Sequence, residues 1–202
     1  MIAPTDCAIV MGQRGCGKSY LARNFQSLWP RRVIIDSLNE YRDGGLIVHN
    51  FSDFADSLLH FHEVNQKEFV LIYQFDFEAR NKEHIFEEIL KLCYYLGNIQ
   101  VVVEEVQIYA SIHNLPWRLE NALLTGRHQN ISLLFTSQRP GMVNKTIVSQ
   151  CSHVFVGRIS EGNDLKYLRS ILGDEVEKLR LLPDRRFLYF SKEGVKEISN
   201  EF

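Results

Sequence analysis

The sequence predicts a doubly wound α/β fold, in which helices cover both faces of a mostly parallel β-sheet. Three observations lead to this prediction. Short apolar segments rich in β-branched residues alternate with longer segments whose apolar residues recur at helical spacing. The short segments are mostly apolar at both odd and even positions, as in strands that are buried on both faces. The last part of the chain instead has two apolar stretches around a turn, which predicts a C-terminal β-hairpin.

The expected elements follow one another in a βα alternation. The first strand is expected over residues 7–11, which read CAIVM, and the first helix over residues 18–28, after a glycine-rich break. Further strands are expected over residues 33–35, 46–49, 69–73, 100–103, 131–136 and 154–156, and further helices over residues 54–61, 79–96, 117–124, 144–150 and 164–172. The hairpin is expected over residues 187–198, with its turn at residues 192–194. Such an alternation is typical of parallel strands joined by crossover helices.

The composition limits what the chain can be. With 202 residues, of which 45% are hydrophobic, the chain can bury one good-sized core, so we expect a single domain over residues 1–202. The formal net charge of -2 gives no overall basic field, so contact with nucleic acid would need a local patch or a ring of subunits. No apolar run approaches the roughly 18 residues that span a bilayer. Neither a zinc site nor a disulfide framework is expected, and a reducing cytoplasm is the expected location, because four widely separated cysteines without metal-ligand spacing are present: Cys7, Cys16, Cys93 and Cys151.

A phosphate-binding loop is predicted between the first strand and the first helix. Residues 12–19 read GQRGCGKS and match the pattern G-x-x-x-x-G-K-[ST] without a mismatch. The glycines let backbone N–H groups surround the phosphates, and the helix directs the positive end of its dipole towards them. Lys18 is expected to reach the phosphates and Ser19 to bind Mg²⁺, whereas Cys16 is interpreted as a small residue that fills the loop. The predicted nucleotide-binding residues are Gly12, Gln13, Arg14, Gly15, Cys16, Gly17, Lys18, Ser19 and Tyr20.

Two adjacent acids follow the strand expected over residues 100–103. Glu104 is predicted to hold a water molecule on the metal, and Glu105 to orient the water molecule that attacks the phosphate. The usual metal-side residue is aspartate, so the longer side chain of Glu104 is a departure from the pattern. A charged strand end that faces solvent is the alternative interpretation. Asp76, three residues beyond the strand at residues 69–73, is a rival for the role of Glu105.

Two sequence patterns that other P-loop proteins carry are missing here, and this limits which nucleotide and which reaction are expected. Residues 144–147 read NKTI and lack the aspartate of the guanine-reading pattern Asn-Lys-x-Asp, so ATP is favoured. The arginine pairs at residues 31–32 and 185–186 do not lie in an evident lid of the kind that small-molecule kinases carry. A small-molecule phosphotransferase therefore stays open, without support.

Residues 125–140, which read TGRHQNISLLFTSQRP, resemble the FtsK/HerA superfamily of DNA-pumping ATPases. In that family a Gly-Arg helix end leads into an apolar strand that finishes in Thr-x-Gln-Arg-Pro. The likeness continues in RISEGND at residues 158–164, similar to the family's arginine-then-aspartate segment, and with the phosphate loop and the acid pair it spans residues 7 to about 172. Within the superfamily the chain looks like the genome-packaging ATPases of tailless icosahedral viruses with an internal membrane, such as turreted viruses of Sulfolobus.

The resemblance implies a RecA-like (ASCE) P-loop NTPase that hydrolyses ATP with Mg²⁺. It implies a homo-oligomeric ring, usually a hexamer, that threads double-stranded DNA into a preformed capsid. A capsid or membrane portal protein would be its docking partner, and the motor would act in the host cytoplasm or in association with the virion. A plasmid or conjugation translocase of the same superfamily stays open.

Three further residues are candidates for catalysis. Gln138, at the end of a strand expected beside the phosphate-loop strand, is predicted to sense the γ-phosphate and the attacking water, although it could instead only begin a turn at Pro140. The resemblance also implies an arginine that reaches into the site of a neighbouring subunit. Arg127 matches its position, and Arg158 is the alternative. Either could be an ordinary surface arginine.

Overall fold

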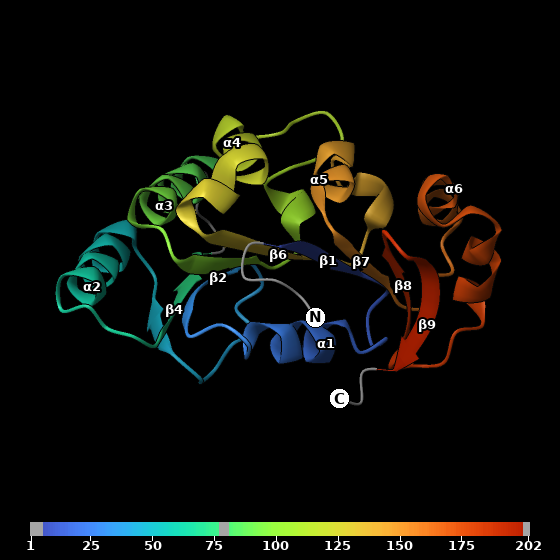
Figure 1. Cartoon of the computed structure of the whole chain (residues 1–202), viewed down its shortest axis with the longest axis horizontal. Helices are drawn as coiled ribbons and strands as arrows, with labels where there is room; N and C mark the ends of the chain where they lie inside the picture. Colours follow the sequence, from blue (N-terminus) through green and yellow to red (C-terminus); the bar gives the residue numbers. More distant parts are fainter. Residues whose placement is uncertain (1–5, 77–80, 200–202) are drawn as a thin grey trace.

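The computed structural model describes residues 6–76 and 81–199, and within these residues a single mixed sheet of nine strands forms the centre of the molecule (Figure 1). Its strand order is β3-β4-β2-β5-β6-β1-β7-β8-β9. The strands from β3 to β7 in this order are parallel, and β8 and β9 are antiparallel to their neighbours, so the predicted mostly parallel sheet and C-terminal hairpin are confirmed. The strands are β1 Cys7–Met11, β2 Arg31–Asp36, β3 Leu46–Val48, β4 Phe69–Gln74, β5 Ile99–Val103, β6 Ile131–Ser137, β7 His153–Val156, β8 Arg186–Ser191 and β9 Gly194–Ser199.

Helices connect the parallel strands, and short 3₁₀ helices follow several of them. Helix α2 begins three residues before its predicted start and α6 two residues before, because Asn50 and Glu161 act as N-caps by accepting bonds from the backbone of Asp53 and Asp164. The predicted start of α3 at residue 79 lies outside the described residues. The helices are α1 Lys18–Gln26, α2 Phe51–Glu63, α3 Lys82–Leu96, α4 Trp117–Thr125, α5 Lys145–Gln150 and α6 Gly162–Leu172, and the 3₁₀ helices are η1 Val106–Ile108, η2 Gly126–Gln129, η3 Pro140–Met142 and η4 Gly173–Arg180.

The helices are divided unequally between the two faces of the sheet. Helices α2 to α5 lie on one face, and α1 lies on the other (Figure 1). The connections that carry α2, α3, α4 and α5 all cross the sheet from the β3 side towards the β7 side, whereas α1 leads from β1 back to β2. Because crossover connections between parallel strands are right-handed, reversing the direction of crossing moves the helix to the other face. The predicted double winding is therefore present, but one face is covered much less than the other.

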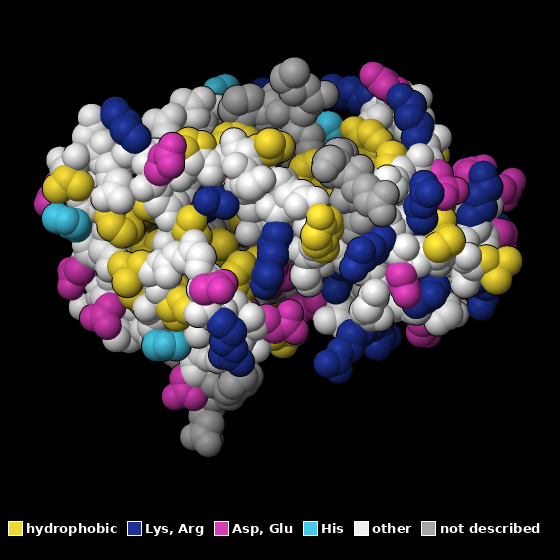
Figure 2. All heavy atoms as spheres, turned by 90° about the horizontal axis from the view of Figure 1, so that it is seen from below, with side chains coloured by type: hydrophobic (Ala, Val, Ile, Leu, Met, Phe, Trp, Pro, Cys, Tyr) yellow, Lys and Arg dark blue, Asp and Glu magenta, His cyan; other side chains and the backbone are white. Residues whose placement is uncertain are grey.

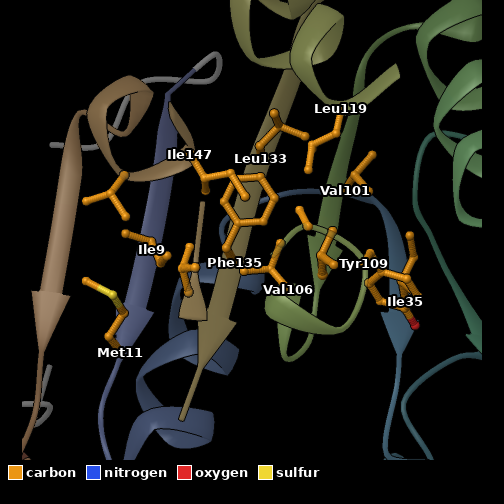
Figure 3. Close-up of a cluster of buried hydrophobic side chains, with 14 of the residues drawn as sticks. Ile9, Met11, Ile35, Val101, Val106, Tyr109, Leu119, Leu133, Phe135 and Ile147 are labelled. Carbon is orange, nitrogen blue, oxygen red and sulfur yellow. The ribbon is translucent and has the colours of Figure 1, made fainter. Parts of the chain in front are cut away.

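The core has two parts, one on each face of the sheet. Odd-numbered positions of the central strands, such as Ile9, Val101 and Leu133, pack under α3, α4 and α5 in the larger part (Figure 3). Even-numbered positions, such as Val10 and Val102, pack against α1 in the smaller part. Burial on both parities explains why these strands are almost wholly apolar in sequence.

The connections between strands change direction across the sheet at β1, which lies between β6 and β7 and is parallel to both. The connection that leaves β1 passes over one face of the sheet, and the connection that leaves its neighbour β6 passes over the other. In open α/β sheets a crevice forms outside the carboxyl ends of the strands at such a point, and ligands bind there. The fold therefore directs attention to the segments that follow β1, β5 and β6. Among residues 6–76 and 81–199, no helix is both long and apolar enough to cross a membrane.

Candidate nucleotide-binding site

The glycine-rich loop leaves β1 at Met11 and enters α1 at Lys18, as predicted. Gly15 and Gly17 have φ values of 85° and 95°, a region that favours glycine, and Gly17 is the N-cap residue of α1. No side chain caps this end of α1, and its first turn carries no acid, so its backbone N–H groups are suited to an anion. The loop is held from behind, because the N–H groups of Gly12 and Gln13 donate to the carbonyls of Ser137 and Arg158 at 3.1 and 3.0 Å.

Cys16 fills the inside of this loop. Its side chain is fully buried, and a Cβ atom added to Gly12 would lie 2.6 Å from the Cys16 sulfur. The glycine at position 12 is thus required by close packing, and burial raises the pKa of the Cys16 thiol. Both observations support the interpretation of Cys16 as a structural filler. The neighbouring residues Arg14 and Tyr20 are exposed.

Lys18 and Glu105 meet beside the loop. Their side chains are each only 7% exposed, and the distance from Lys18 Nζ to Glu105 Oε1 is 3.8 Å. The other carboxylate oxygen of Glu105 accepts hydrogen bonds from Gln107 Nε2 at 2.7 Å and from the backbone N–H of Gln138 at 2.9 Å. The site therefore holds a carboxylate in one orientation next to the lysine that is predicted to bind phosphate.

The backbone at Glu105 adopts a strained conformation. Its φ of 51° lies in the left-handed region, which costs a residue with a side chain about 1–3 kcal/mol. Its N–H donates to the hydroxyl of Thr136 at 3.1 Å, which helps to hold this conformation. The left-handed backbone at Glu105 interrupts the regular alternation of side-chain directions along β5. As a result, the two adjacent acids point to different partners.

Glu104 lies between β5 and α1 and is 9% exposed. Its two oxygens accept hydrogen bonds from the Tyr41 hydroxyl at 3.0 Å and from the Thr136 hydroxyl at 2.6 Å. Burial raises the pKa of Glu104, and these two hydrogen bonds and nearby Lys18 oppose the rise. Each carboxylate oxygen has a second lone pair, so Glu104 can still accept a bond from a metal-bound water.

The donor set fits a Mg²⁺ ion that is held mainly by the phosphates of a nucleotide. No group of three or more His, Cys, Asp or Glu side chains that could hold a metal occurs within the described part of the chain. Mg²⁺ commonly uses one or two protein oxygens and takes the others from water and phosphate. Ser19, half-buried in the first turn of α1, and Glu104 are residues of this kind.

The strand that ends near Gln138 lies directly between the loop strand and the acid strand. β6 pairs with β1 on one side and with β5 on the other, so the prediction that this strand neighbours the phosphate-loop strand is confirmed. Gln138 contributes its backbone N–H to Glu105, and its half-buried side chain follows at the same edge of the sheet. The next residues are fixed by Asp164, which contacts Arg139 Nε at 3.4 Å and accepts a bond from the N–H of Gly141 at 2.8 Å.

Asp76 is not brought to this site. It is exposed beyond β4, which is separated from β1 by β2, β5 and β6. Glu105, by contrast, contacts Lys18. The geometry thus favours Glu105 over its rival.

The two candidate arginine fingers lie at opposite ends of the parallel strands, one at their amino ends and one at their carboxyl ends. Arg127 is exposed in η2, before the amino end of β6, where it lines a cavity of about 400 Å³ with Cys7 and Lys192. Arg158 follows the carboxyl end of β7, beside the chain's own loop, and its Nη2 lies 2.7 Å from Asp184 Oδ1. Arg127 is consequently far from the Lys18 site of its own chain, whereas Arg158 is next to it.

Three residues of the site have roles that the sequence did not indicate. Gln107 holds Glu105, Tyr41 holds Glu104, and Thr136 contacts both acids. Thr136 lies in the Thr-x-Gln-Arg-Pro segment, so its place in that motif could have indicated a role in the site. Tyr41 lies in an irregular segment after β2, and nothing in its surroundings distinguishes it in the sequence.

No protein-family model matches the chain. The chain is 23% identical over 196 residues to Protein P9 of Pseudoalteromonas phage PM2, covering 93% of this chain and 86% of that protein.

Similar solved structures include the genome packaging NTPase B204 from Sulfolobus turreted icosahedral virus 2 in complex with ATP-gammaS. It has a TM-score of 0.77 and 18% sequence identity, over 97% of this chain and 98% of that chain. The complex of B204 with AMPPCP has a TM-score of 0.75 and 20% identity, with the same coverage. EccC (ATPases 2 and 3) of Thermomonospora curvata has a TM-score of 0.56 and 15% identity, over 96% of this chain and 36% of that chain. These similarities confirm the predicted α/β P-loop NTPase fold, and the expected resemblance to packaging ATPases holds at the level of the fold.

Proposed function

We propose that the chain is an ATPase of the FtsK/HerA type that moves double-stranded DNA, most directly to package a viral genome into a preformed capsid. The observation that carries the proposal is the pairing of Lys18 with Glu105 beside a complete phosphate loop. The fold shared with a genome packaging NTPase and the likeness to a phage protein support the same conclusion.

The loop and Lys18 would bind the β- and γ-phosphates of ATP. The N–H groups at the start of α1 would face the phosphate oxygens, and Lys18 would neutralise charge that grows as the γ-phosphate leaves. Mg²⁺, when bound through Ser19 and Glu104, supplies further neutralisation of the phosphate charge. Because Lys18 Nζ is 3.8 Å from Glu105, a phosphate on this lysine is adjacent to the carboxylate.

Glu105 would orient and deprotonate the attacking water. One of its oxygens is occupied by Gln107 and by the N–H of Gln138, and the other is directed to the Lys18 side. A positioned general base contributes about 10²–10⁴-fold to a rate. Gln138 would link the state of this carboxylate to β6 and so to the loop between β6 and α5.

Arg127 would complete the site of a neighbouring subunit. Its position at the amino edge of the sheet excludes contact with its own loop but suits a ring in which that edge faces the carboxyl edge of the next copy. Such head-to-tail contacts close into rings, and a hexamer is the ring size we propose. Arg158 would then act within its own subunit, where it already backs the loop through its carbonyl.

A local basic surface would contact DNA despite the net charge of -2. Lys and Arg side chains spread over the face that α1 covers and towards the C-terminal hairpin (Figure 2). A ring repeats each of them in every subunit, and phosphate contacts of this type weaken as salt displaces them. The exposed arginines near α1 and the loop are Arg14, Arg23, Arg185 and Arg186.

A motor of this kind would act in the host cytoplasm or in association with the virion, and would dock on a capsid or membrane portal protein. A plasmid or conjugation DNA translocase would use the same chemistry.

The test is ATP hydrolysis with and without double-stranded DNA across a salt series. We expect DNA to stimulate hydrolysis at low salt and the stimulation to disappear as salt rises. Phosphorylation of a small-molecule acceptor would instead identify a phosphotransferase. Hydrolysis that DNA does not change at any salt concentration would contradict the proposal.

A further inference from the structure

Two cysteines that are 144 residues apart in the sequence are in contact at the amino edge of the sheet. Cys7 begins β1 and Cys151 lies two residues before β7, and both are free thiols in this structure. Their sulfur atoms are 3.0 Å apart, compared with about 2.05 Å in a disulfide. A movement of roughly 1 Å would therefore bring them to bonding distance. The four cysteines are free in this structure, as expected from the sequence, but the spacing in the sequence did not indicate that two of them would be in contact.

The backbone holds the two residues in this arrangement. β1 and β7 are adjacent parallel strands, and Ala8 is paired with His153. The N–H of Ser152 donates to the carbonyl of Cys7 at 2.9 Å, and Asp6 Oδ2 lies 3.0 Å from His153 Nε2. Adjacent strands lie about 4.8 Å apart, within the range of Cα separations that a disulfide spans. The segment that carries Cys151 is thus hydrogen-bonded directly to Cys7 and held beside it.

Cys7 and Cys151 are half-buried and line two hollows of the surface, unlike the other two cysteines. Cys7 lines the cavity of about 400 Å³ that also contains Arg127 and Lys192. Cys151 lines a separate cavity of about 340 Å³ beside α5 and α6. Burial and the neighbouring Cys7 raise the pKa of Cys151, which keeps its thiol protonated. Cys16 and Cys93 are almost fully buried and have no such access.

We propose that Cys7 and Cys151 form a reversible disulfide that joins the starts of β1 and β7 when the protein meets a peroxide. The Cys7 thiol gives up its proton, and its sulfur attacks one oxygen of the peroxide. The O–O bond breaks, Cys7 becomes a sulfenic acid, and the departing hydroxide takes up the proton that Cys7 released and leaves as the first water. The sulfur of Cys151 then attacks the Cys7 sulfur, and the S–O bond breaks. The proton of Cys151 leaves with that oxygen as the second water. Two thiols are oxidised to one disulfide, and one hydrogen peroxide is reduced to two waters.

The bond would stabilise the fold without blocking the phosphate loop. It lies at the amino edge of the sheet, whereas the loop and Gly157 follow the carboxyl ends of the same two strands. Cross-linking residues so far apart in the sequence removes much of the conformational freedom of the unfolded chain. We expect the melting temperature to rise on the order of 10 °C.

The test is to treat the full chain with a small excess of hydrogen peroxide, digest it without reducing agent, and identify the peptides by mass. We expect a linked peptide pair containing Cys7 and Cys151, lighter than the sum of its parts by two hydrogens. The rise in melting temperature should accompany this link and be reversed by dithiothreitol. Cys7→Ser and Cys151→Ser should each lose the linked peptide and the rise, whereas Cys93→Ser, which removes a buried thiol elsewhere, should keep both.

Three results would overturn the proposal. One is peroxide-treated wild-type protein in which Cys7 carries sulfinic acid and no linked peptide forms. Another is a link that joins two copies of the chain, seen as a dimer on a non-reducing gel. The third is a rise in melting temperature that persists in both serine variants. The peptide map of the wild-type protein decides the matter even if a serine variant does not fold.

Discussion

At the scale of single residues, the carboxylates of the two adjacent acids after β5 have different partners. Glu105 faces Lys18 and is held by Gln107 and Gln138, whereas Glu104 is enclosed by the hydroxyls of Tyr41 and Thr136. One carboxylate thus lies beside the lysine that is predicted to bind phosphate, and the other lies in a small polar network with Tyr41 and Thr136. The different roles proposed for them follow from these surroundings.

Replacing Glu105 by glutamine should separate binding from turnover. The amide has the same shape and can keep the contacts at Gln107 and Gln138, but it cannot take a proton from water. We expect Glu105→Gln to bind ATP with nearly unchanged affinity and to hydrolyse it at least about 10²-fold more slowly. Single-turnover hydrolysis and nucleotide binding by the same preparation measure the two effects. Glu193→Gln, an exposed glutamate in the hairpin turn, is the matched control.

Unchanged turnover in Glu105→Gln would show that another group activates the water. A loss of ATP binding equal to the loss of turnover would show that Glu105 is structural.

The raised pKa of Glu104 predicts a pH-dependent difference in stability. Because its pKa is higher in the folded chain than in the unfolded chain, the folded state binds more protons between the two values. The contribution of Glu104 to stability therefore falls as pH rises above the unfolded value of 4.5 and through the folded value. Glu104→Gln has no such charge. Its melting temperature relative to wild type should therefore increase with pH from 4 to 8, by an amount that corresponds to the titration of about one group. Melting curves of both proteins across this range measure the difference, and a constant difference would contradict the assigned burial.

At the scale of elements, β6 joins the acid strand to the loop strand. It pairs with β5 and β1, and at its end Thr136 donates to Glu104 and accepts from the N–H of Glu105. One side chain thus connects β6 with both acids. The left-handed backbone of Glu105 depends in part on that connection.

Removing the hydroxyl of Thr136 should loosen this junction. Thr136→Val keeps the shape of the side chain but leaves a buried carboxylate and a buried N–H without this partner, which costs about 1–3 kcal/mol of unfolding free energy. Thr136→Ser keeps the hydroxyl and should retain most of the stability and turnover. Denaturant unfolding and ATP hydrolysis of the two variants provide the comparison. Equal losses in both would mean that the methyl group, and not the hydroxyl, is what β6 contributes.

The sequence predicted the elements that carry motifs and the strands that are buried on both faces. The phosphate loop, β5 with its acids and β6 with its Gln138 follow from patterns that depend on neighbouring residues. Contacts between distant segments could not be predicted in this way. Tyr41 reaches Glu104 across 63 residues, and Cys7 reaches Cys151 only because β7 follows β1 in the sheet. The placement of α1 on the face opposite α2 to α5 depends on strand order, which no local pattern contains.

At the scale of the whole molecule, the carboxyl and amino ends of the parallel strands carry different functional residues. The carboxyl edge holds the loop, Lys18 and the acids, and the amino edge holds Arg127 and the cysteine pair. One copy therefore presents a site at one edge and a candidate finger at the other. A ring would bring the two edges of adjacent copies together.

Mixing two inactive variants tests this arrangement. Lys18→Ala should abolish hydrolysis because the lysine stabilises charge in the transition state, and Arg127→Ala should reduce it about 10³-fold or more if the finger acts in trans. Equimolar mixing should restore part of the activity, since some interfaces would combine an intact loop with an intact finger. Activity of the wild type should also rise more than linearly with protein concentration. Arg42→Ala, which removes another exposed arginine, should remain active on its own.

If the two variants never rescue one another and wild-type activity is strictly proportional to concentration, Arg127 does not act in trans. Arg158 would then be tested in the same mixture.

We propose that ATP hydrolysis at the Lys18 site moves the protein along double-stranded DNA. The most direct measurement is displacement of a labelled triplex-forming oligonucleotide from a linear duplex. We expect wild-type protein with ATP and Mg²⁺ to release the oligonucleotide, with a delay that lengthens as the triplex is placed farther from the loading end. Glu105→Gln should bind the same DNA and release nothing. Release without ATP, release by Glu105→Gln, or DNA-stimulated hydrolysis by wild type without any release would contradict the claim.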